Sequence, residues 1–213
     1  PGSAQYREQD LNTELSPQTV RALLQEVVQL VARALPRARS VTVQESKFGS
    51  FSRIYRLDIG DEILAVEVPQ CNDEPTAEQK SRRETVRRNF QHFMDYWARG
   101  LRRFVPEPQL AADIEGIPIG VYEFLEGYKE LNVGEGILRQ LESAPRNRLV
   151  AVPLETTEVA HVLAELIAAV VYHYEPERDG GTTITDVLIN NGDFIYQRNP
   201  NGSPAIRLVT IRD

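Results

Sequence analysis

The sequence is poor in the residues on which several well-known kinds of site depend. It contains one cysteine, Cys71, which excludes a disulfide framework or a cysteine-rich metal site and fits a reducing compartment. Its three histidines, at positions 92, 161 and 173, show no metal-ligand spacing with a second ligand. A Walker A loop and a Gly-x-Ser-x-Gly motif are also missing. We therefore expect neither a resident metal nor a cofactor.

Long apolar runs and excess positive charge are missing as well. No run reaches the roughly 18 residues of a membrane span, and no signal peptide is recognisable. The formal net charge of −7 argues against nucleic-acid binding. The 213 residues, 41% of them apolar, suit one or two small globular lobes. These features indicate a cytoplasmic protein, or the cytosolic domain of a larger or membrane-anchored one. The scarcity of lysine relative to arginine indicates a GC-rich, bacterial genome.

The N-terminal part of the chain is expected to contain one helix. Residues 1–15 are interpreted as a cloning remnant followed by a loose polar segment. Ser16 then caps a helix over residues 16–36, with Pro17 at its first position. Apolar residues recur in this helix at spacings of three and four. We expect the helix to pack on the outside of the next domain rather than to bind a partner as a free element.

The pattern after this helix predicts a mixture of strands and helices, and hence an α+β fold. Up to residue 125 we expect a three-stranded antiparallel meander over residues 40–68, a long helix over 76–103, and strands at 109–112 and 120–124. The last two strands meet at the turn Glu115-Gly116. Beyond residue 126 we expect helices over 133–141 and 156–174, and strands at 187–190, 194–197 and 206–211. In the helix over 156–174 the expected buried face comprises Val159, Leu163, Leu166, Ile167 and Val170.

Several short runs, taken in order, resemble motifs of protein kinases. They are Phe51-Ser52-Arg53-Ile54-Tyr55 at the end of a glycine-rich loop, Val121-Tyr122-Glu123-Phe124-Leu125-Glu126-Gly127 as a hinge, Asp186-Val187-Leu188-Ile189 after a catalytic loop, and Leu208-Val209-Thr210-Ile211-Arg212 near a metal-binding aspartate. The resemblance covers residues 40–213. It implies a kinase-like N-lobe at residues 37–125, with a five-stranded antiparallel sheet and one long helix. It further implies a minimal, truncated C-lobe at residues 126–213.

At the positions where kinases carry their charges, this chain has other residues. The resemblance aligns the phosphate-binding lysine with Glu67, the catalytic aspartate with Gly181, the metal-binding asparagine with Asp186 and the metal-binding aspartate with Thr210. In the glycine-rich loop only Gly49 is retained, with Lys47 and Ser52 at the outer glycine positions. A carboxylate at the lysine position would repel a triphosphate. Lys47 and Asp179 are candidates for relocated catalytic residues.

The apolar part of a nucleotide pocket is retained. Ile54, Ala65 and Leu188 align with residues that sandwich an adenine ring, and the segment from Glu123 to Leu125 could offer backbone hydrogen bonds. We therefore expect a catalytically inactive, pseudokinase-like domain that binds nucleotide weakly or not at all. Its expected function is to bind another protein as a scaffold or regulatory module.

The long helix suggests where such a partner could bind. It is rich in arginine, and Arg83, Arg87 and Arg88 would form a docking face for an acidic or phosphorylated partner, or a solvated surface. Two alternatives stay open. One is an atypical minimal kinase, of the kind seen among bacterial effectors, that uses Lys47, Asp179 and Asp186. The other is an unrelated α+β adaptor that binds an acidic partner through the basic helix.

Overall fold

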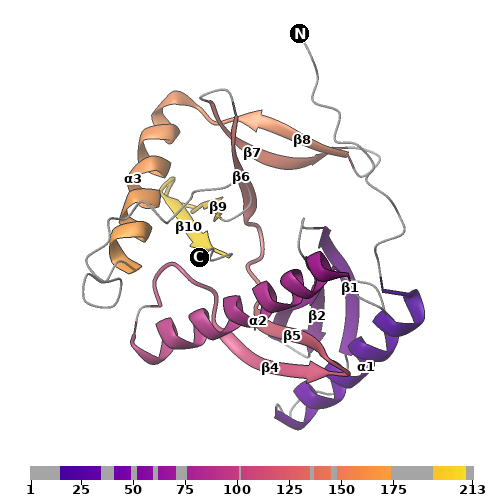
Figure 1. Ribbon diagram of the computed structural model, residues 1–213. Helices are drawn as coiled ribbons and strands as arrows, with labels where there is room; N and C mark the ends of the chain where they lie inside the picture. Colours follow the sequence, from indigo (N-terminus) through magenta and orange to yellow (C-terminus); the bar gives the residue numbers. More distant parts are fainter. Residues whose placement is uncertain are drawn as a thin grey trace. The chain divides into compact units, whose positions relative to one another are not determined.

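The computed structural model describes residues 15–34, 41–48, 52–59, 62–70, 76–100, 102–134, 137–144, 148–173 and 194–209. In this part of the chain the fold is α+β, with three helices and two antiparallel sheets (Figure 1). The chain divides into two compact units. The first unit comprises Pro1–Arg87 and Leu110–Val121, and the second comprises Arg88–Gln109 and Tyr122–Asp213.

Helix α1 (Pro17–Ala34) begins where the sequence predicts it. The Ser16 hydroxyl accepts a hydrogen bond of 3.1 Å from the backbone N–H of Thr19, and Val20 N–H donates to the Ser16 carbonyl at 3.0 Å. The bond to the hydroxyl satisfies an N–H group that the helix itself leaves without a partner, and the bond to the carbonyl is the first regular bond of the helix. Pro17 has no N–H to satisfy and fits the first helical position.

The first sheet has the strand order β1-β2-β3-β5-β4. Its strands are β1 (Val41–Phe48), β2 (Ser52–Ile59), β3 (Glu62–Pro69), β4 (Pro108–Ile114) and β5 (Ile117–Glu123). The predicted meander is confirmed, because β1 pairs with β2 and β2 with β3, both antiparallel. The predicted turn between β4 and β5 is also confirmed. Glu115 (φ 53°) and Gly116 (φ 77°) both have positive φ, the geometry that joins tightly paired strands.

Helix α1 packs on one face of this sheet, as predicted. Leu23, Val27 and Val31 are buried against Tyr55 and Leu57 of β2 and against apolar residues of β3 and β5. Alternation along each strand places every second side chain on this face. The helix is therefore part of the core of the first unit.

Helix α2 (Ala77–Ala98) follows β3 and precedes β4 along the chain. Its start is a capping box: Gln79 N–H donates to the Thr76 hydroxyl at 3.3 Å, and Thr76 N–H donates to Gln79 Oε1 at 2.9 Å. The helix ends before residue 103, the predicted end. Gly100 has φ 80° and its N–H donates to the Trp97 carbonyl, so a left-handed glycine terminates the helix.

The second sheet has the strand order β10-β9-β6-β7-β8. Its strands are β6 (Lys129–Gly134), β7 (Ile137–Ala144), β8 (Arg148–Pro153), β9 (Phe194–Arg198) and β10 (Pro204–Leu208). The helix predicted over residues 133–141 is wrong, because these residues belong to the β6–β7 hairpin. Gly134 pairs directly with Ile137, so only two residues connect the strands. A glycine-bearing two-residue connection favours a hairpin over a helix.

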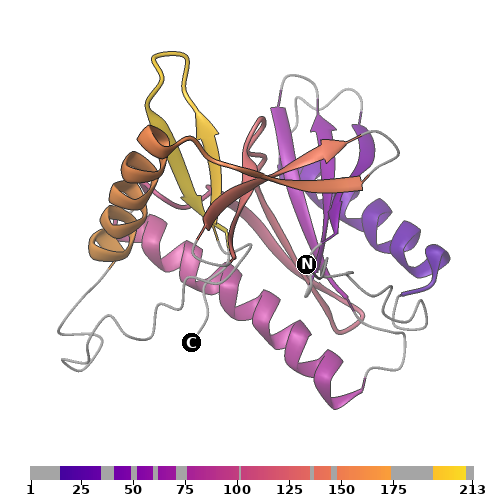
Figure 2. The same ribbon diagram turned by 90° about the horizontal axis from the view of Figure 1, so that it is seen from above.

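Helix α3 (Thr156–His173) matches the predicted helix, but its predicted buried face is partly wrong. Val162, Leu166 and Ala169 are buried, whereas Leu163 and Ile167 are exposed. Among the elements of the second unit, α3 packs beside β10 (Figure 2). The strand predicted at 194–197 is confirmed as β9, and that predicted at 206–211 begins and ends earlier, as β10. The strand predicted at 187–190 lies outside the described residues.

A buried asparagine links α2 to the end of the second sheet. Asn89 is buried on α2, and its side-chain amide donates to the Val209 carbonyl at 3.3 Å, which ties the helix to the segment after β10. None of the helices in the described ranges is long and apolar enough to cross a membrane.

Replacing Leu23 by alanine tests whether α1 belongs to the core of the first unit. Because Leu23 is buried between α1 and the sheet, Leu23→Ala should lower the free energy of unfolding by about 2–5 kcal/mol. The exposed Gln29 on the same helix provides the control, and Gln29→Ala should change it by less than about 0.5 kcal/mol. Urea denaturation measures both. Equal effects of the two substitutions would contradict the packing of α1 as a core element.

Candidate functional site

The candidate site is centred on Glu67, in the interior strand β3. Glu67 pairs with Ile54 of β2, and Ser52, two residues before Ile54, lies on the same face of the sheet. The Ser52 hydroxyl donates a hydrogen bond of 2.7 Å to Glu67 Oε1. Both residues are only 9% exposed. The first unit therefore holds a buried carboxylate and its hydroxyl donor on one face of the sheet.

The strand register brings Glu67 together with two residues that the sequence assigned to a nucleotide pocket, Ile54 and Ala65. Ile54 and Glu67 face each other, and Ala65, two residues before Glu67, points to the same face. This face is opposite to the one that packs on α1, since Tyr55 and Val66 have the other parity and belong to the core. Ile54, Ala65 and Glu67 thus share one face of the sheet, and their assignment to a nucleotide site stays a prediction.

Lys47 lies in the same row of the sheet. It pairs with Ile54 across β1 and β2, after an irregularity in the register between Glu45 and Lys47. The backbone row Lys47–Ile54–Glu67 therefore crosses three adjacent strands. Neighbouring strands lie about 4.8 Å apart, so the backbones of Lys47 and Glu67 are about 10 Å apart across the sheet. The role of Lys47 as a relocated phosphate-binding residue stays a prediction.

The hydrogen bond from Ser52 determines what this site can do chemically. A buried carboxylate is costly unless donors satisfy it, and a bond to a charged acceptor contributes about 1.5–3 kcal/mol. Ser52 and Glu67, which the kinase resemblance aligns with a glycine and a lysine, thus form one interacting pair. A carboxylate and a hydroxyl can accept hydrogen bonds or bind cations.

The predicted hinge uses one of its donors internally. Glu123 ends β5, and its backbone N–H donates to the Glu107 carbonyl at 2.8 Å. Its carboxylate accepts a bond of 3.3 Å from the backbone N–H of Glu107. The Glu123 N–H therefore already donates to a carbonyl of the protein. Leu125, two residues on, is half-buried.

The other residues predicted from the kinase resemblance lie outside the described ranges. They are Gly49, Asp179, Gly181, Asp186, Leu188 and Thr210. Their roles stay predictions. Within the described residues, no group of three or more histidine, cysteine, aspartate or glutamate side chains could hold a metal ion.

The arginines of α2 make bonds within the first unit. Arg87 donates to Glu84 at 2.6 Å and to Asp113 of β4 at 2.9 Å. Its hydrogen bond with Asp113, and next that with Glu84, raise the pKa of Arg87 above its usual value, so it remains cationic. Arg83 donates to the Gly116 carbonyl at 3.1 Å, and Arg88 is exposed. The three arginines predicted to bind a partner thus include two that attach α2 to the β4–β5 hairpin.

Two functional contacts were not predicted from the sequence. Ser52 was identified as a loop position but not as the donor to Glu67, and Asp113 was not identified as the partner of Arg87. The first could have been found by writing the β2–β3 register from the Gly60-Asp61 turn. In that register Ser52 pairs with Pro69 and is a diagonal neighbour of Glu67 on the same face. The second joins residues of α2 and β4 and carries no local signal.

Comparison of the sequence with models of known protein families gives no match, and comparison with curated proteins gives no match either.

A double-mutant cycle on Ser52 and Glu67 tests their coupling. Ser52→Ala removes a donor from a buried carboxylate and should lower the free energy of unfolding by about 1–3 kcal/mol. In a Glu67→Gln background, where the acceptor is neutral, the same serine substitution should cost clearly less. Urea denaturation of the four proteins gives the coupling. Additive effects would show that the 2.7 Å bond does not stabilise the protein.

A charge swap tests whether Arg87 has a structural role. Arg87→Glu removes two ion pairs and places like charges together, and should lower the free energy of unfolding by about 0.5–2 kcal/mol, since exposed pairs contribute about 0.2–1 kcal/mol each. Adding Asp113→Arg should restore part of this loss. Lys80→Glu, at an exposed position of the same helix, is the control and should have little effect. The absence of any rescue by Asp113→Arg would argue against the pair.

Proposed function

We propose that the chain contains a kinase-like domain that does not transfer phosphoryl groups and that acts by binding another protein. The observation that carries this proposal is the Ser52–Glu67 pair. Under the resemblance, a lysine would hold the nucleotide phosphates at position 67, whereas this protein has a buried carboxylate with its own hydroxyl donor. The pair supports loss of the phosphate site, because Glu67 is satisfied from within the sheet.

The architecture of the described residues is compatible with the proposal. A five-stranded antiparallel sheet with one long helix between its third and fourth strands is what the resemblance implies for an N-lobe. The second sheet is not what the resemblance implies. Its hairpin β6–β7 and strand β8 precede α3 and enlarge the C-terminal part beyond a minimal C-lobe. Such an addition provides surface on which a partner could bind.

The electrostatic argument can be given a magnitude. A carboxylate about 4 Å from a phosphate charge, at an effective dielectric constant of about 20, costs about 4 kcal/mol. That corresponds to a loss of affinity of about a thousandfold. Phosphoryl transfer depends almost entirely on positioning and on positive charge. A site with a carboxylate in this place is therefore suited to a role other than catalysis.

The partner surface of the proposal does not have to be the basic face of α2. Arg83 and Arg87 bond to the β4–β5 hairpin, and two carboxylates share the charge of Arg87. A partner that competes for Arg87 would have to replace bonds that are already made. The proposed scaffold function therefore rests on the loss of the phosphate site and leaves open an acidic or phosphorylated partner.

One observation favours a second candidate, an atypical minimal kinase. Lys47 lies in the same row of the sheet as Ile54 and Glu67, one strand beyond Ile54. The backbone of β1 therefore places a lysine position two strands from Glu67. In such a kinase, Glu67 would orient the lysine instead of repelling the nucleotide.

Thermal denaturation with ATP, with and without Mg²⁺, separates the two candidates. For the proposed function we expect no magnesium-dependent rise in the melting temperature of the native protein. Glu67→Lys places a cation where the kinase resemblance expects one, and this variant should bind ATP more tightly than the native protein. A magnesium-dependent rise that Lys47→Ala abolishes and Lys129→Ala preserves would overturn the proposal in favour of the minimal kinase.

A further inference from the structure

Helix α3 exposes a row of large apolar side chains. Leu163, Ile167 and Val171 are 45%, 62% and 56% exposed and are spaced four residues apart. Residues at this spacing lie one above the other on a helix. Six large apolar side chains are exposed in the described part of the chain, and three of them form this row. The concentration on one helix distinguishes it from the scattered apolar exposure that is normal for proteins.

A second row, made of alanines, runs beside the first. Ala160 and Ala164 are exposed and Ala168 is half-buried, again at spacings of four. On a helix with 3.6 residues per turn, this row is adjacent to that of Leu163, Ile167 and Val171. Large side chains form a ridge, and small ones form a shallow groove parallel to it. The exposed face of α3 therefore carries both halves of a helix-packing surface.

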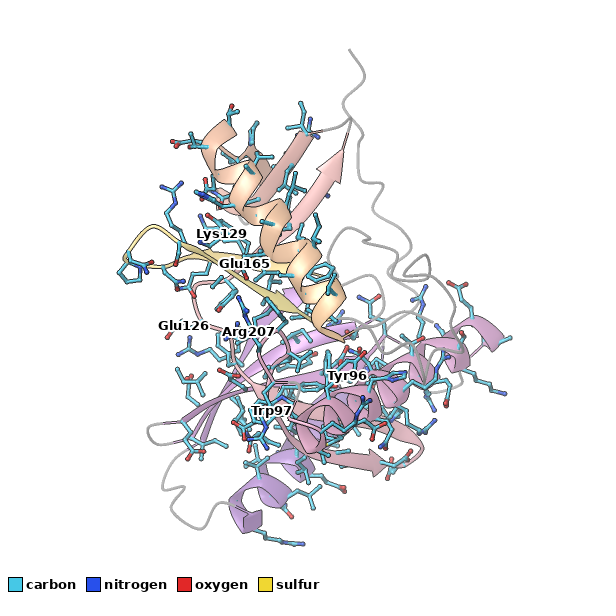
Figure 3. The ribbon with its side chains drawn as sticks, turned by 90° about the vertical axis from the view of Figure 1, so that its left-hand side faces the viewer. Tyr96, Trp97, Glu126, Lys129, Glu165 and Arg207 are labelled. Carbon is cyan, nitrogen blue, oxygen red and sulfur yellow. The ribbon has the colours of Figure 1, made fainter. Side chains whose placement is uncertain are left out.

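The charged residues of α3 are directed to other contacts. Glu158 forms a two-point ion pair with Arg198 of β9, with N–O distances of 2.9 and 2.7 Å. Glu165 pairs with Arg103 at 3.3 Å (Figure 3 labels Glu165 on α3). Between Ala160 and Val171 the only other ionisable residue is His161. The two rows thus form an apolar face in a chain of which 26% of the residues are charged.

The buried face of the helix explains why the exposed one is unused within the second unit. Val162, Leu166 and Ala169 are buried, and β10 contacts the helix. No other described helix or strand of the second unit covers the opposite side of α3 (Figure 2). Both faces of the helix are apolar, but the unit has only one core for them.

We infer that this face is the interface through which two copies of the chain associate. A surface that carries a ridge and a parallel groove is complementary to itself, since a two-fold axis places the ridge of each copy in the groove of the other. The occupant must also be uncharged along the contact, and the same face of a second copy meets this requirement. This inference is independent of whether the domain binds nucleotide.

The size of the face determines how strong the association is. An α-helix of 18 residues is about 27 Å long. An interface made by one such helix from each copy is at the low end for specific contacts, below about 1,200 Å² in total. We therefore expect a reversible dimer rather than an obligate one.

Sedimentation velocity over a series of protein concentrations tests the inference. The native chain should shift from monomer to dimer as its concentration rises. Ile167→Asp places a charge in the ridge and should raise the dissociation constant at least about tenfold. Ile137→Asp, at another exposed isoleucine on β7, is the matched control and should leave the dimer intact. Circular dichroism should show unchanged helix content in both variants.

A second variant separates specific packing from general stickiness. Ala164→Leu fills the groove, retains the helix and makes the face more apolar. Ridge-into-groove packing predicts that it weakens the dimer, whereas non-specific association predicts that it strengthens it. A native chain that remains monomeric at every concentration would overturn the inference. So would a dimer that survives both Ile167→Asp and Ala164→Leu, including one formed through another surface.

Discussion

Strand β5 is buried on both faces. Ile117, Ile119 and Val121 belong to the core that includes α1. Tyr122, of the opposite parity, contacts Phe90 and Phe93 of α2, with ring centroids 5.4 and 5.6 Å apart. A strand with apolar residues on both faces needs side chains packed against both sides of the sheet. Strand β5 lies between β3 and β4. Strand β3, which carries Glu67, is hydrogen-bonded directly to β5.

The position of Glu67 in an interior strand explains why its charge is satisfied by the protein. At the surface, water would solvate the carboxylate, and no particular neighbour would be needed. In β3 the carboxylate is nearly enclosed, so a donor such as Ser52 must come from the adjacent strand. The Ser52 hydroxyl meets part of this requirement.

Local signals made much of the fold predictable, and non-local contacts made the rest unpredictable. The caps at Ser16 and Thr76 and the turn at Gly116 act within a few residues, so the starts of α1 and α2 and the β4–β5 turn could be predicted from the sequence. The sequence of the β6–β7 hairpin predicts a helix, because Val133, Ile137 and Leu141 recur at a spacing of four residues. Helix α3 is apolar around most of its circumference, and the sequence could not tell which face the unit covers. For the candidate site, the strand pattern located Glu67, but its donor required the pairing of two strands.

The strand order of the second sheet has a consequence for how the chain folds during synthesis. The first sheet is complete once the ribosome has released β5, because all its strands lie before residue 124. In the second sheet, β6 pairs with β9, which is made much later. Until then β6 has an unpaired edge, and closing so long a loop is slow. The nascent chain therefore carries an open β edge for most of the time that the second unit takes to appear, and this interval is when it most needs protection from aggregation.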